Sequence, residues 1–139
     1  MKLKTLFIAI GLLSIGSSCS KEECPTSSPS TGIVGEWKLI EELMDPGDGS
    51  GTFQPVSSNK IITFLGDGTF EANGGMCYME NQANTASTGT YDVTTEMFAP
   101  GDCINFPPMP IEYQYSVNGN TLILTYPCIE GCKQKYSRL

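Results

Sequence analysis

Histidine is absent from this chain of 139 residues, so the side chain that most often moves protons near neutral pH is not available. Serine and cysteine nucleophiles therefore lack their ordinary proton-accepting partner, and we expect no enzymatic activity. Basic residues are also scarce, because eight Lys and Arg stand against fifteen Asp and Glu. An acidic chain without a Lys/Arg cluster repels phosphate backbones, so we expect no nucleic-acid partner.

Motifs for metal ions and phosphate groups are missing as well. The stretch from Asp45 to Gly51 looks like a calcium loop, but Gly47 and Gly49 stand where an EF-hand loop needs oxygen ligands. Pro, Gly and Asp are ordinary turn formers, which favours a plain surface loop here. Gly74 and Gly75 follow a strand-like segment without opening a helix, unlike a phosphate loop. We expect neither a metal ion nor a cofactor.

The apolar run at the start of the chain, residues 6–15, is too short for a membrane span, which takes about 20 residues. It follows Lys2 and Lys4 and leads into the small residues 16–18. A basic start, a short apolar core and a small-residue zone are typical of a secretory signal peptide. We therefore assign residues 1–18 to a cleaved signal.

The residues after this signal resemble those of bacterial lipoproteins. Cys19 after the small residues resembles a lipobox cysteine, which becomes the lipidated first residue of the mature chain. Lys21, Glu22 and Glu23 resemble the export tag of surface lipoproteins in Bacteroidetes-type bacteria. Residues 19–31 are rich in Ser, Thr and Pro and read as a flexible tether. The resemblance implies a lipid anchor in the outer membrane, with display at the cell surface.

Six cysteines in an exported chain favour disulfides. Cys19 is assigned to lipid and Cys24 lies in the tether, which leaves four in the folded part: Cys77, Cys103, Cys128 and Cys132. Four cysteines allow three pairings; we favour Cys128–Cys132 and Cys77–Cys103, although sequence alone does not fix connectivity. A zinc site and redox catalysis are the alternatives, and the Cys-x-x-x-Cys spacing matches neither pattern well.

From residue 32 onward the chain is a series of short strand-like segments, and none has a helical period over 11 residues. The strand-like segments are 35–43, 61–65, 69–72, 89–93, 111–117, 121–126 and 133–139. Gly66-Asp67-Gly68 and Asn118-Gly119 are strong hairpin signals. This spacing predicts an antiparallel sandwich or barrel, and a final strand that closes on the first favours the barrel.

The first predicted strand places Trp37, Leu39 and Leu43 on one face. Strict alternation puts Glu41 on the same face, as an inward acid, unless a bulge or the end of the strand intervenes. A buried acid of this kind is a candidate general acid, and a position at the mouth in contact with water is the alternative.

Four motifs together resemble the lipocalin-like lipoproteins of Bacteroidetes-type bacteria: Gly35-x-Trp37, the segment 62–70, Gly89-Thr-Tyr91 and the segment 122–126. The resemblance implies an all-β fold, a small antiparallel up-and-down barrel of about eight strands over residues 32–139. It also implies that Gly35 and Trp37 of the Gly-x-Trp motif form, with Arg138, a structural plug in which Trp37 closes one end of the barrel beneath Arg138. A Trp–Arg stack of this kind contributes roughly 0.5–2 kcal/mol.

Ligand contacts are expected at the open end of such a barrel. Residues 97–110 lack periodicity and are predicted to form a stiff apolar loop, which together with the loop 45–51 would receive a ligand. The candidate ligand-binding residues are Tyr91, Phe98, Phe106, Met109, Tyr113 and Tyr115. Small barrels usually fill their interiors with side chains, so core packing is the alternative for these residues.

The sequence therefore predicts a monomeric, lipid-anchored surface protein. Its expected partner, besides the membrane held through Cys19, is a small apolar or amphipathic ligand. The alternative is a non-enzymatic accessory protein with a filled barrel that contacts other envelope proteins. The two differ in cavity volume, because a small-ligand site takes about 300–1,000 Å³ and a packed interior would argue against ligand binding.

Overall fold

The computed structural model of the chain describes residues 32–101, 103 and 113–139. The predicted signal peptide, the tether and two of the candidate ligand contacts lie outside these residues. The features concerned are Cys19, Lys21, Glu22, Glu23, Cys24, Phe106 and Met109. Within the described ranges there is no helix long and apolar enough to cross a membrane.

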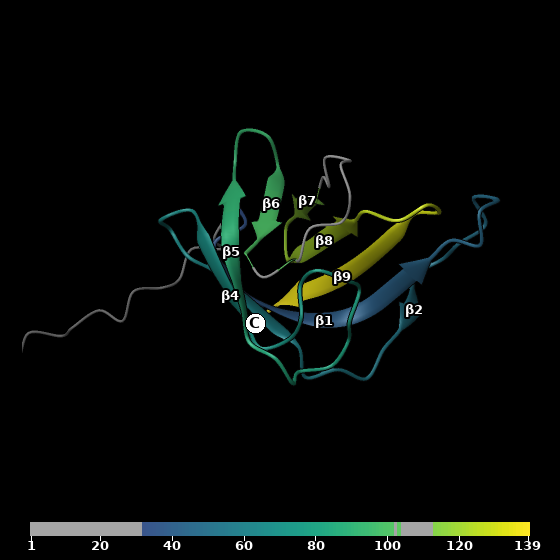
Figure 1. Cartoon of the computed structure of the whole chain (residues 1–139), viewed down its shortest axis with the longest axis horizontal. Coiled ribbons are helices and arrows are strands. Elements are labelled where there is room, and N and C mark those ends of the chain that lie inside the picture. The colour runs from purple at the N-terminus through teal and green to yellow at the C-terminus, as the bar shows by residue number, and fades with distance from the viewer. Residues whose placement is uncertain (1–31, 102, 104–112) are drawn as a thin grey trace, which may run out of the picture.

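The described part of the chain is all β-structure (Figure 1). The strands are β1 (Gly35–Met44), β2 (Gln54–Pro55), β3 (Ile61–Phe64), β4 (Thr69–Ala72), β5 (Ser87–Asp92), β6 (Met97–Pro100), β7 (Tyr113–Asn118), β8 (Thr121–Tyr126) and β9 (Cys132–Arg138). Each strand from β3 to β9 pairs antiparallel with the next, β1 pairs with β3, and β9 closes on β1. The result is a closed eight-stranded up-and-down barrel, and the short β2 pairs with β1 beyond the part of β1 that pairs with β3. The predicted fold class is confirmed.

Strand β1 contains a bulge that changes which of its acids faces inward. Leu39 pairs with Tyr136, but the next paired residue is Glu41, opposite Lys135, so Ile40 is the extra residue. A bulge reverses the alternation of side chains beyond it. Glu42, paired with the buried Gln134, therefore faces inward.

The outward face of the same region carries the ion pair between Glu41 and Lys135. The Lys135 ammonium also lies 4.1 Å from the centre of the Phe53 ring, just before β2. The inward position of Glu41 under strict alternation is thus wrong, and so is the shared face of Leu43 with Trp37. The bulge explains both differences.

Strand β6 is a second correction, because residues 97–100 form a strand and not the start of a loop. Met97–Pro100 pairs with β5 along its length and with β7 at Met97 and Phe98. Pro100, which has no N–H to donate, stands at the end of the strand, where that loss is tolerated. The strand buries Phe98 to 3 % exposure in the core.

Side chains fill the middle of the barrel. The buried hydrophobic residues are Ile33, Trp37, Leu39, Ile62, Phe64, Phe70, Ala72, Met76, Phe98, Tyr113, Tyr115, Leu122, Leu124, Tyr126 and Tyr136. Their rings pack at angles, as in the edge-on contact of Phe64 with Tyr91 and the tilted contact of Phe98 with Tyr113. Such edge and tilted arrangements are those that aromatic quadrupoles favour.

Trp37 and Arg138 plug one end of the barrel, which we call the closed end. The Trp37 side chain is fully buried, and its indole N–H donates to the Ile33 carbonyl at 2.7 Å. The Arg138 guanidinium lies 4.1 Å from the centre of the indole ring and donates to the Val34 carbonyl at 2.8 Å. A Cβ on Gly35 would come within 2.7 Å of that guanidinium, so the glycine makes room for it.

The turn between β5 and β6 holds Glu96 at a φ of 55°, the left-handed conformation that favours glycine. We expect Glu96→Gly to raise the free energy of unfolding by about 0.5–1 kcal/mol, since relief of backbone strain exceeds the added entropy of the unfolded chain. Urea titration followed by circular dichroism measures it. The neighbouring Thr95→Gly, where φ is not positive, should instead destabilise. Equal effects at both positions would contradict the strain argument.

Candidate functional site

The end of the barrel opposite Trp37, which we call the mouth, is where the long connections lie. The segment from β1 to β3, the segment from β4 to β5 and the β8–β9 turn all meet there. The β4–β5 connection, residues 73–86, is the lid. Its backbone accepts hydrogen bonds from Gln134 on β9 and Tyr113 on β7, far from β4 and β5 in the strand order. The lid therefore crosses the mouth of the barrel, in front of β1 and β9 in Figure 1.

Lys60, just before β3, holds the lid from inside. Its side chain is fully buried, and its ammonium donates to the carbonyls of Gly75 at 2.6 Å and Glu80 at 2.7 Å. Burial lowers the pKa of Lys60 from 10.5 to about 8, although Glu80 and Glu42 act in the opposite direction. A buried ammonium is costly unless it is well hydrogen-bonded, and the lid supplies those bonds.

Gln134 on β9 is the centre of the polar network beneath the lid. Its amide oxygen accepts from the hydroxyls of Tyr126 at 2.8 Å and Tyr136 at 2.7 Å. Its amide nitrogen donates to Glu42 at 2.7 Å and to the Glu80 carbonyl at 3.0 Å. Because burial also raises the pKa of both tyrosines, they stay protonated and donate. The network ties β1, β8, β9 and the lid together.

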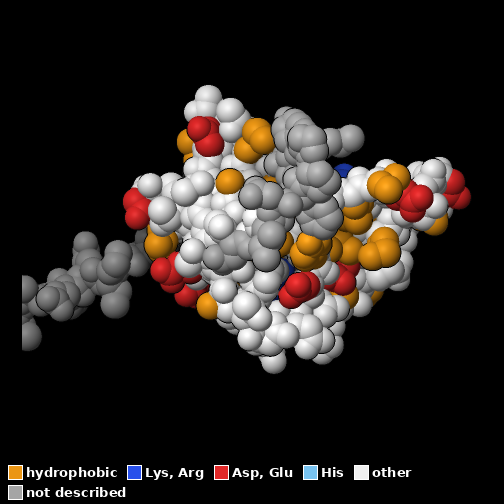
Figure 2. All heavy atoms as spheres, viewed as in Figure 1, with side chains coloured by type: hydrophobic (Ala, Val, Ile, Leu, Met, Phe, Trp, Pro, Cys, Tyr) orange, Lys and Arg blue, Asp and Glu red, His pale blue; other side chains and the backbone are white. Residues whose placement is uncertain are grey.

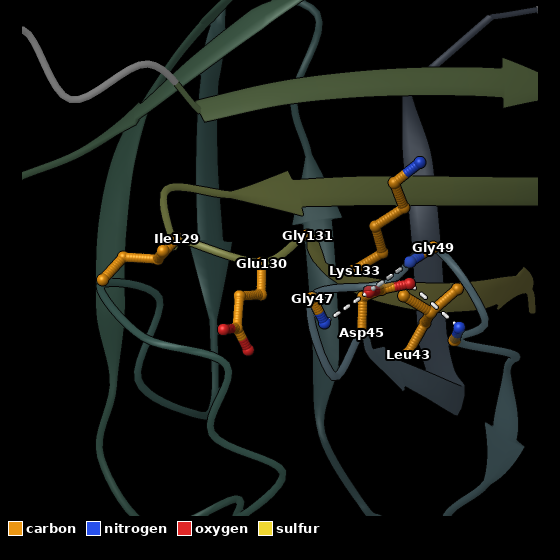
Figure 3. Close-up of a pocket in the computed structure, with 9 residues that line it drawn as sticks. Leu43, Asp45, Gly47, Gly49, Ile129, Glu130, Gly131 and Lys133 are labelled. Carbon is orange, nitrogen blue, oxygen red and sulfur yellow. Dashed lines mark hydrogen bonds between the residues drawn. The ribbon is translucent and has the colours of Figure 1, made fainter.

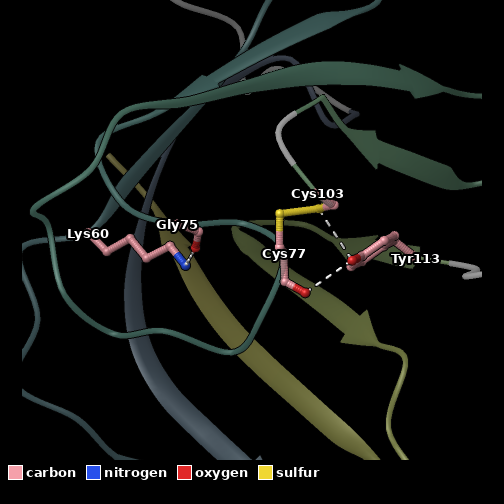
Figure 4. The surroundings of a disulfide bond; sticks show 5 residues. All are labelled: Lys60, Gly75, Cys77, Cys103 and Tyr113. Atoms are coloured by element: carbon pink, nitrogen blue, oxygen red, sulfur yellow. Dashed lines mark hydrogen bonds between the residues drawn. A yellow bond between two sulfur atoms is a disulfide. The ribbon is translucent and has the colours of Figure 1, made fainter. Parts of the chain in front are cut away.

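A disulfide fastens the lid to the other side of the mouth. Cys77 in the lid is bonded to Cys103, which follows β6 (Figure 4). The Tyr113 hydroxyl donates to the Cys77 carbonyl at 3.0 Å. The second disulfide, Cys128–Cys132, spans the β8–β9 turn. Both bridges are the ones that the sequence analysis favours, and both lie at the mouth.

A pocket of about 620 Å³ lies at the rim of the mouth and is open to solvent (Figure 3). Its walls come from the loop after β1 and from the β8–β9 turn. The lining residues are Leu43, Asp45, Gly47, Gly49, Gly51, Ile129, Glu130, Gly131 and Lys133. The volume falls within the range of small-ligand sites. We call it the rim pocket.

The Asp45 carboxylate shapes the loop on one side of the rim pocket. It accepts hydrogen bonds from the backbone N–H groups of Gly51 at 2.9 Å, Gly49 at 3.0 Å and Gly47 at 2.7 Å. These bonds, with Gly51 first, lower the pKa of Asp45. The loop at 45–51 is therefore an ordered wall built around one carboxylate.

Apolar side chains are exposed at the same rim. Ile129 is 101 % exposed and Met44 is 72 % exposed. On the face shown in Figure 2, hydrophobic side chains gather towards the right half, and acidic side chains far outnumber basic ones. At the rim itself, exposed Ile129 and Met44 lie near the carboxylates of Asp45 and Glu130.

The four candidate ligand-binding residues in the described part of the chain, Tyr91, Phe98, Tyr113 and Tyr115, do not line the rim pocket. Phe98, Tyr113 and Tyr115 are core residues no more than 7 % exposed, and Tyr91 packs against them. The structure brings these four into one aromatic cluster on β5, β6 and β7. Contact with a ligand stays a prediction for them. Of the predicted loops, 45–51 does line the rim pocket.

The functional features that sequence reasoning missed are the lid, Lys60 and Gln134. Lys60 follows three polar residues and Gln134 stands between two lysines in the sequence, and no motif there indicates burial. One signal is available for Gln134: it lies two residues before Tyr136 on the predicted last strand, so both side chains point to the same face of the sheet. Among the described residues, no group of three or more His, Cys, Asp and Glu comes together in a way that could hold a metal ion.

Lys60 gives the protein a characteristic pH dependence. Because its pKa is lower in the folded chain, the unfolded chain binds more protons between pH 8 and 10.5, and stability rises with pH there. We expect the free energy of unfolding to increase by about 1 kcal/mol from pH 7 to pH 9. Urea titrations at both values measure it. Lys60→Met should abolish the increase, and an increase that persists in this variant would contradict the assignment.

Comparison with known proteins agrees with the fold. The model of the lipocalin-like domain family matches residues 33–138, which covers nearly all of the barrel. No curated protein and no solved structure matches the chain. The family match spans more than half of the chain and ends at Arg138, in the strand that closes the barrel. The chain belongs to the lipocalin-like domain family.

Proposed function

We propose that this protein is a lipid-anchored lipoprotein of the outer membrane that binds a small amphipathic ligand at the barrel mouth. The observation that carries the proposal is the rim pocket, whose volume of about 620 Å³ suits a small molecule. Leu43 and Ile129 offer apolar contact, and Asp45, Glu130 and Lys133 offer polar contact. A lipocalin-like barrel fits ligand binding in general.

The ligand part is tested with the neutral, amphipathic dye Nile red, whose fluorescence rises in an apolar site. Ile129→Asp should weaken dye binding at least about fivefold, because burial of an isoleucine is favourable by roughly 1.5–3 kcal/mol. Val93, 68 % exposed in the turn between β5 and β6, is a matched control, since it is apolar but lies at the closed end. Val93→Asp should leave the affinity unchanged. Equal affinities of Ile129→Asp and the parent chain would discard the rim pocket.

The anchor part rests on Cys19 and on Lys21, Glu22 and Glu23. Replacement of Cys19 by Ala should move the protein from the detergent phase to the aqueous phase, because no lipid is then attached. Replacement of the three tag residues by alanine should leave the lipid but remove surface labelling of intact cells. Unchanged partitioning or unchanged labelling would contradict the corresponding assignment.

A second function is favoured by the filled interior of the barrel, in which fifteen of the described hydrophobic residues are buried. A packed core leaves less space for a large ligand, and it suits an accessory protein that contacts other envelope proteins. Native mass spectrometry of the delipidated protein separates the two functions. A co-purifying small molecule supports ligand binding, and a protein partner of defined mass supports the accessory role.

A further inference from the structure

The lid places two carbonyl oxygens against the donors inside the barrel. Lys60 Nζ donates to the carbonyls of Gly75 and Glu80, and the Gln134 amide also donates to the Glu80 carbonyl (Figure 4 shows the Lys60–Gly75 bond). Two donors thus converge on one carbonyl oxygen, at 2.7 and 3.0 Å. Such a pair is a preformed acceptor-binding site, because both donors are fully buried and fixed by other contacts.

The lid also places an apolar chain beside one of these carbonyls. Met76 is bonded through its own nitrogen to the Gly75 carbonyl carbon, and its side chain is fully buried in the hydrophobic core. The Gly75 carbonyl, bonded to Lys60, and the Met76 nitrogen form one amide group, and the Met76 side chain is an unbranched apolar chain in the core. Together they resemble an N-alkyl amide. The lid therefore occupies the top of the barrel as a small amide ligand would.

The charges around Lys60 favour a neutral ligand over an anionic one. In the described part of the chain the one ion pair within 4 Å joins Lys135 and Glu41, so Lys60 is held by neutral oxygens. Glu42 and Glu80 act on Lys60 from further away and balance its charge. A ligand carboxylate would lie in the field of both, whereas an uncharged carbonyl meets the donors without that repulsion.

We propose that the donors Lys60 and Gln134 form a site for a small neutral carbonyl compound, an amide or ester with a short apolar chain, which the lid fills until it is displaced. The proposal deepens the proposed function, on which it rests, by naming the ligand class and what regulates access. The Cys77–Cys103 disulfide holds the lid in the site, since it joins the lid to the end of β6 across the mouth. Replacement of both cysteines by serine removes this restraint without a redox step and should let a ligand compete with the lid for the donors.

The experiment compares N-methylhexanamide, hexanoate and hexyl methyl ether as probes by titration calorimetry on the mature chain. The double variant Cys77→Ser/Cys103→Ser frees the lid, and it should bind N-methylhexanamide at least about tenfold more tightly than the oxidised parent. Addition of Lys60→Met to that variant should cost at least about tenfold in affinity for the amide, because a hydrogen bond from a charged donor is lost. Binding of the ether, which has no carbonyl, should not change.

Three outcomes would overturn the proposal, and the Nile red result separates it from the rim pocket. Tighter binding of hexanoate than of the amide would show that the site prefers an anion. Equal amide affinities with and without Lys60→Met would show that Lys60 does not bind the ligand carbonyl. Loss of Nile red binding in Ile129→Asp together with Lys60-independent amide binding would leave the rim pocket standing and this inference refuted. Unchanged Nile red binding in Ile129→Asp together with Lys60-dependent amide binding would refute the rim pocket alone. Absence of amide binding to every variant would refute this inference.

A second variant keeps the test decisive if Lys60→Met does not fold. Met76→Ala in the Cys77→Ser/Cys103→Ser chain empties the space of one unbranched chain and weakens the packing of the lid, while Lys60 and Gln134 stay in place. Apolar cavities of this kind take up small apolar ligands. N-methylhexanamide should raise the melting temperature of this variant by more than about 2 °C over its effect on the Cys77→Ser/Cys103→Ser chain. Equal shifts would overturn the proposal.

Discussion

Trp37→Ala should lower the free energy of unfolding by about 3–5 kcal/mol, the range for removal of a large buried aromatic side chain. The indole is fully buried and packs in the core at the closed end of the barrel. Its removal leaves a cavity, leaves the Ile33 carbonyl without its N–H partner and takes the ring from beneath Arg138. These losses act at one place, where β1, β9 and the residues before β1 are joined.

The measurement is a urea titration followed by far-ultraviolet circular dichroism, because Trp37 is the single tryptophan and its fluorescence is lost in the variant. Trp37→Phe is the matched control, since it keeps an aromatic ring but not the N–H donor. It should cost clearly less than Trp37→Ala. A loss below about 1 kcal/mol for Trp37→Ala would show that the closed end does not depend on this side chain.

The barrel itself could be predicted from the sequence because its signals are local. Alternation on β7 and β8 and the turn at Asn118-Gly119 define one hairpin, and Gly66-Asp67-Gly68 defines another. Positive φ at Gly68 and Gly119 confirms why glycine stands in these turns. Closure is predicted by the final strand-like segment and the family resemblance, and the pairing of Arg138 with Trp37 confirms it.

The interior polar network could not be predicted, because it depends on contacts between residues far apart in the chain. The bulge at Ile40 is one extra residue in a strand that otherwise alternates, and it alone places Glu42 inside. Lys60 and Gln134 are separated by 74 positions. Their burial depends on where the lid lies, and residues 73–86 have no period that would place them across the mouth. The strands of the barrel could therefore be predicted from the sequence, but the position of the lid across the mouth could not.

Gly89→Ala should destabilise the barrel by about 3 kcal/mol, the upper part of the range for an overpacked core. A Cβ at this position would lie 2.3 Å from the Ala99 carbonyl oxygen on β6 and 2.5 Å from the Phe70 ring on β4. Real Cβ atoms essentially never come so close, so β5 must move away from one of its two neighbours. Because one of the obstructing atoms belongs to the backbone of a paired strand, a side-chain rotation does not relieve the contact.

Gly66→Ala is the matched control, because it makes the same chemical change in the same barrel. No atom lies within 4 Å of a Cβ at Gly66, and its φ is not positive. Alanine there should change the free energy of unfolding by less than about 0.5 kcal/mol. Equal losses at the two positions would contradict the crowding argument, because the entropy change of Gly→Ala by itself stabilises the folded chain. A loss confined to Gly89 would show that the Gly-Thr-Tyr motif of β5 is there because the barrel wall leaves no room for a side chain between Phe70 and Ala99.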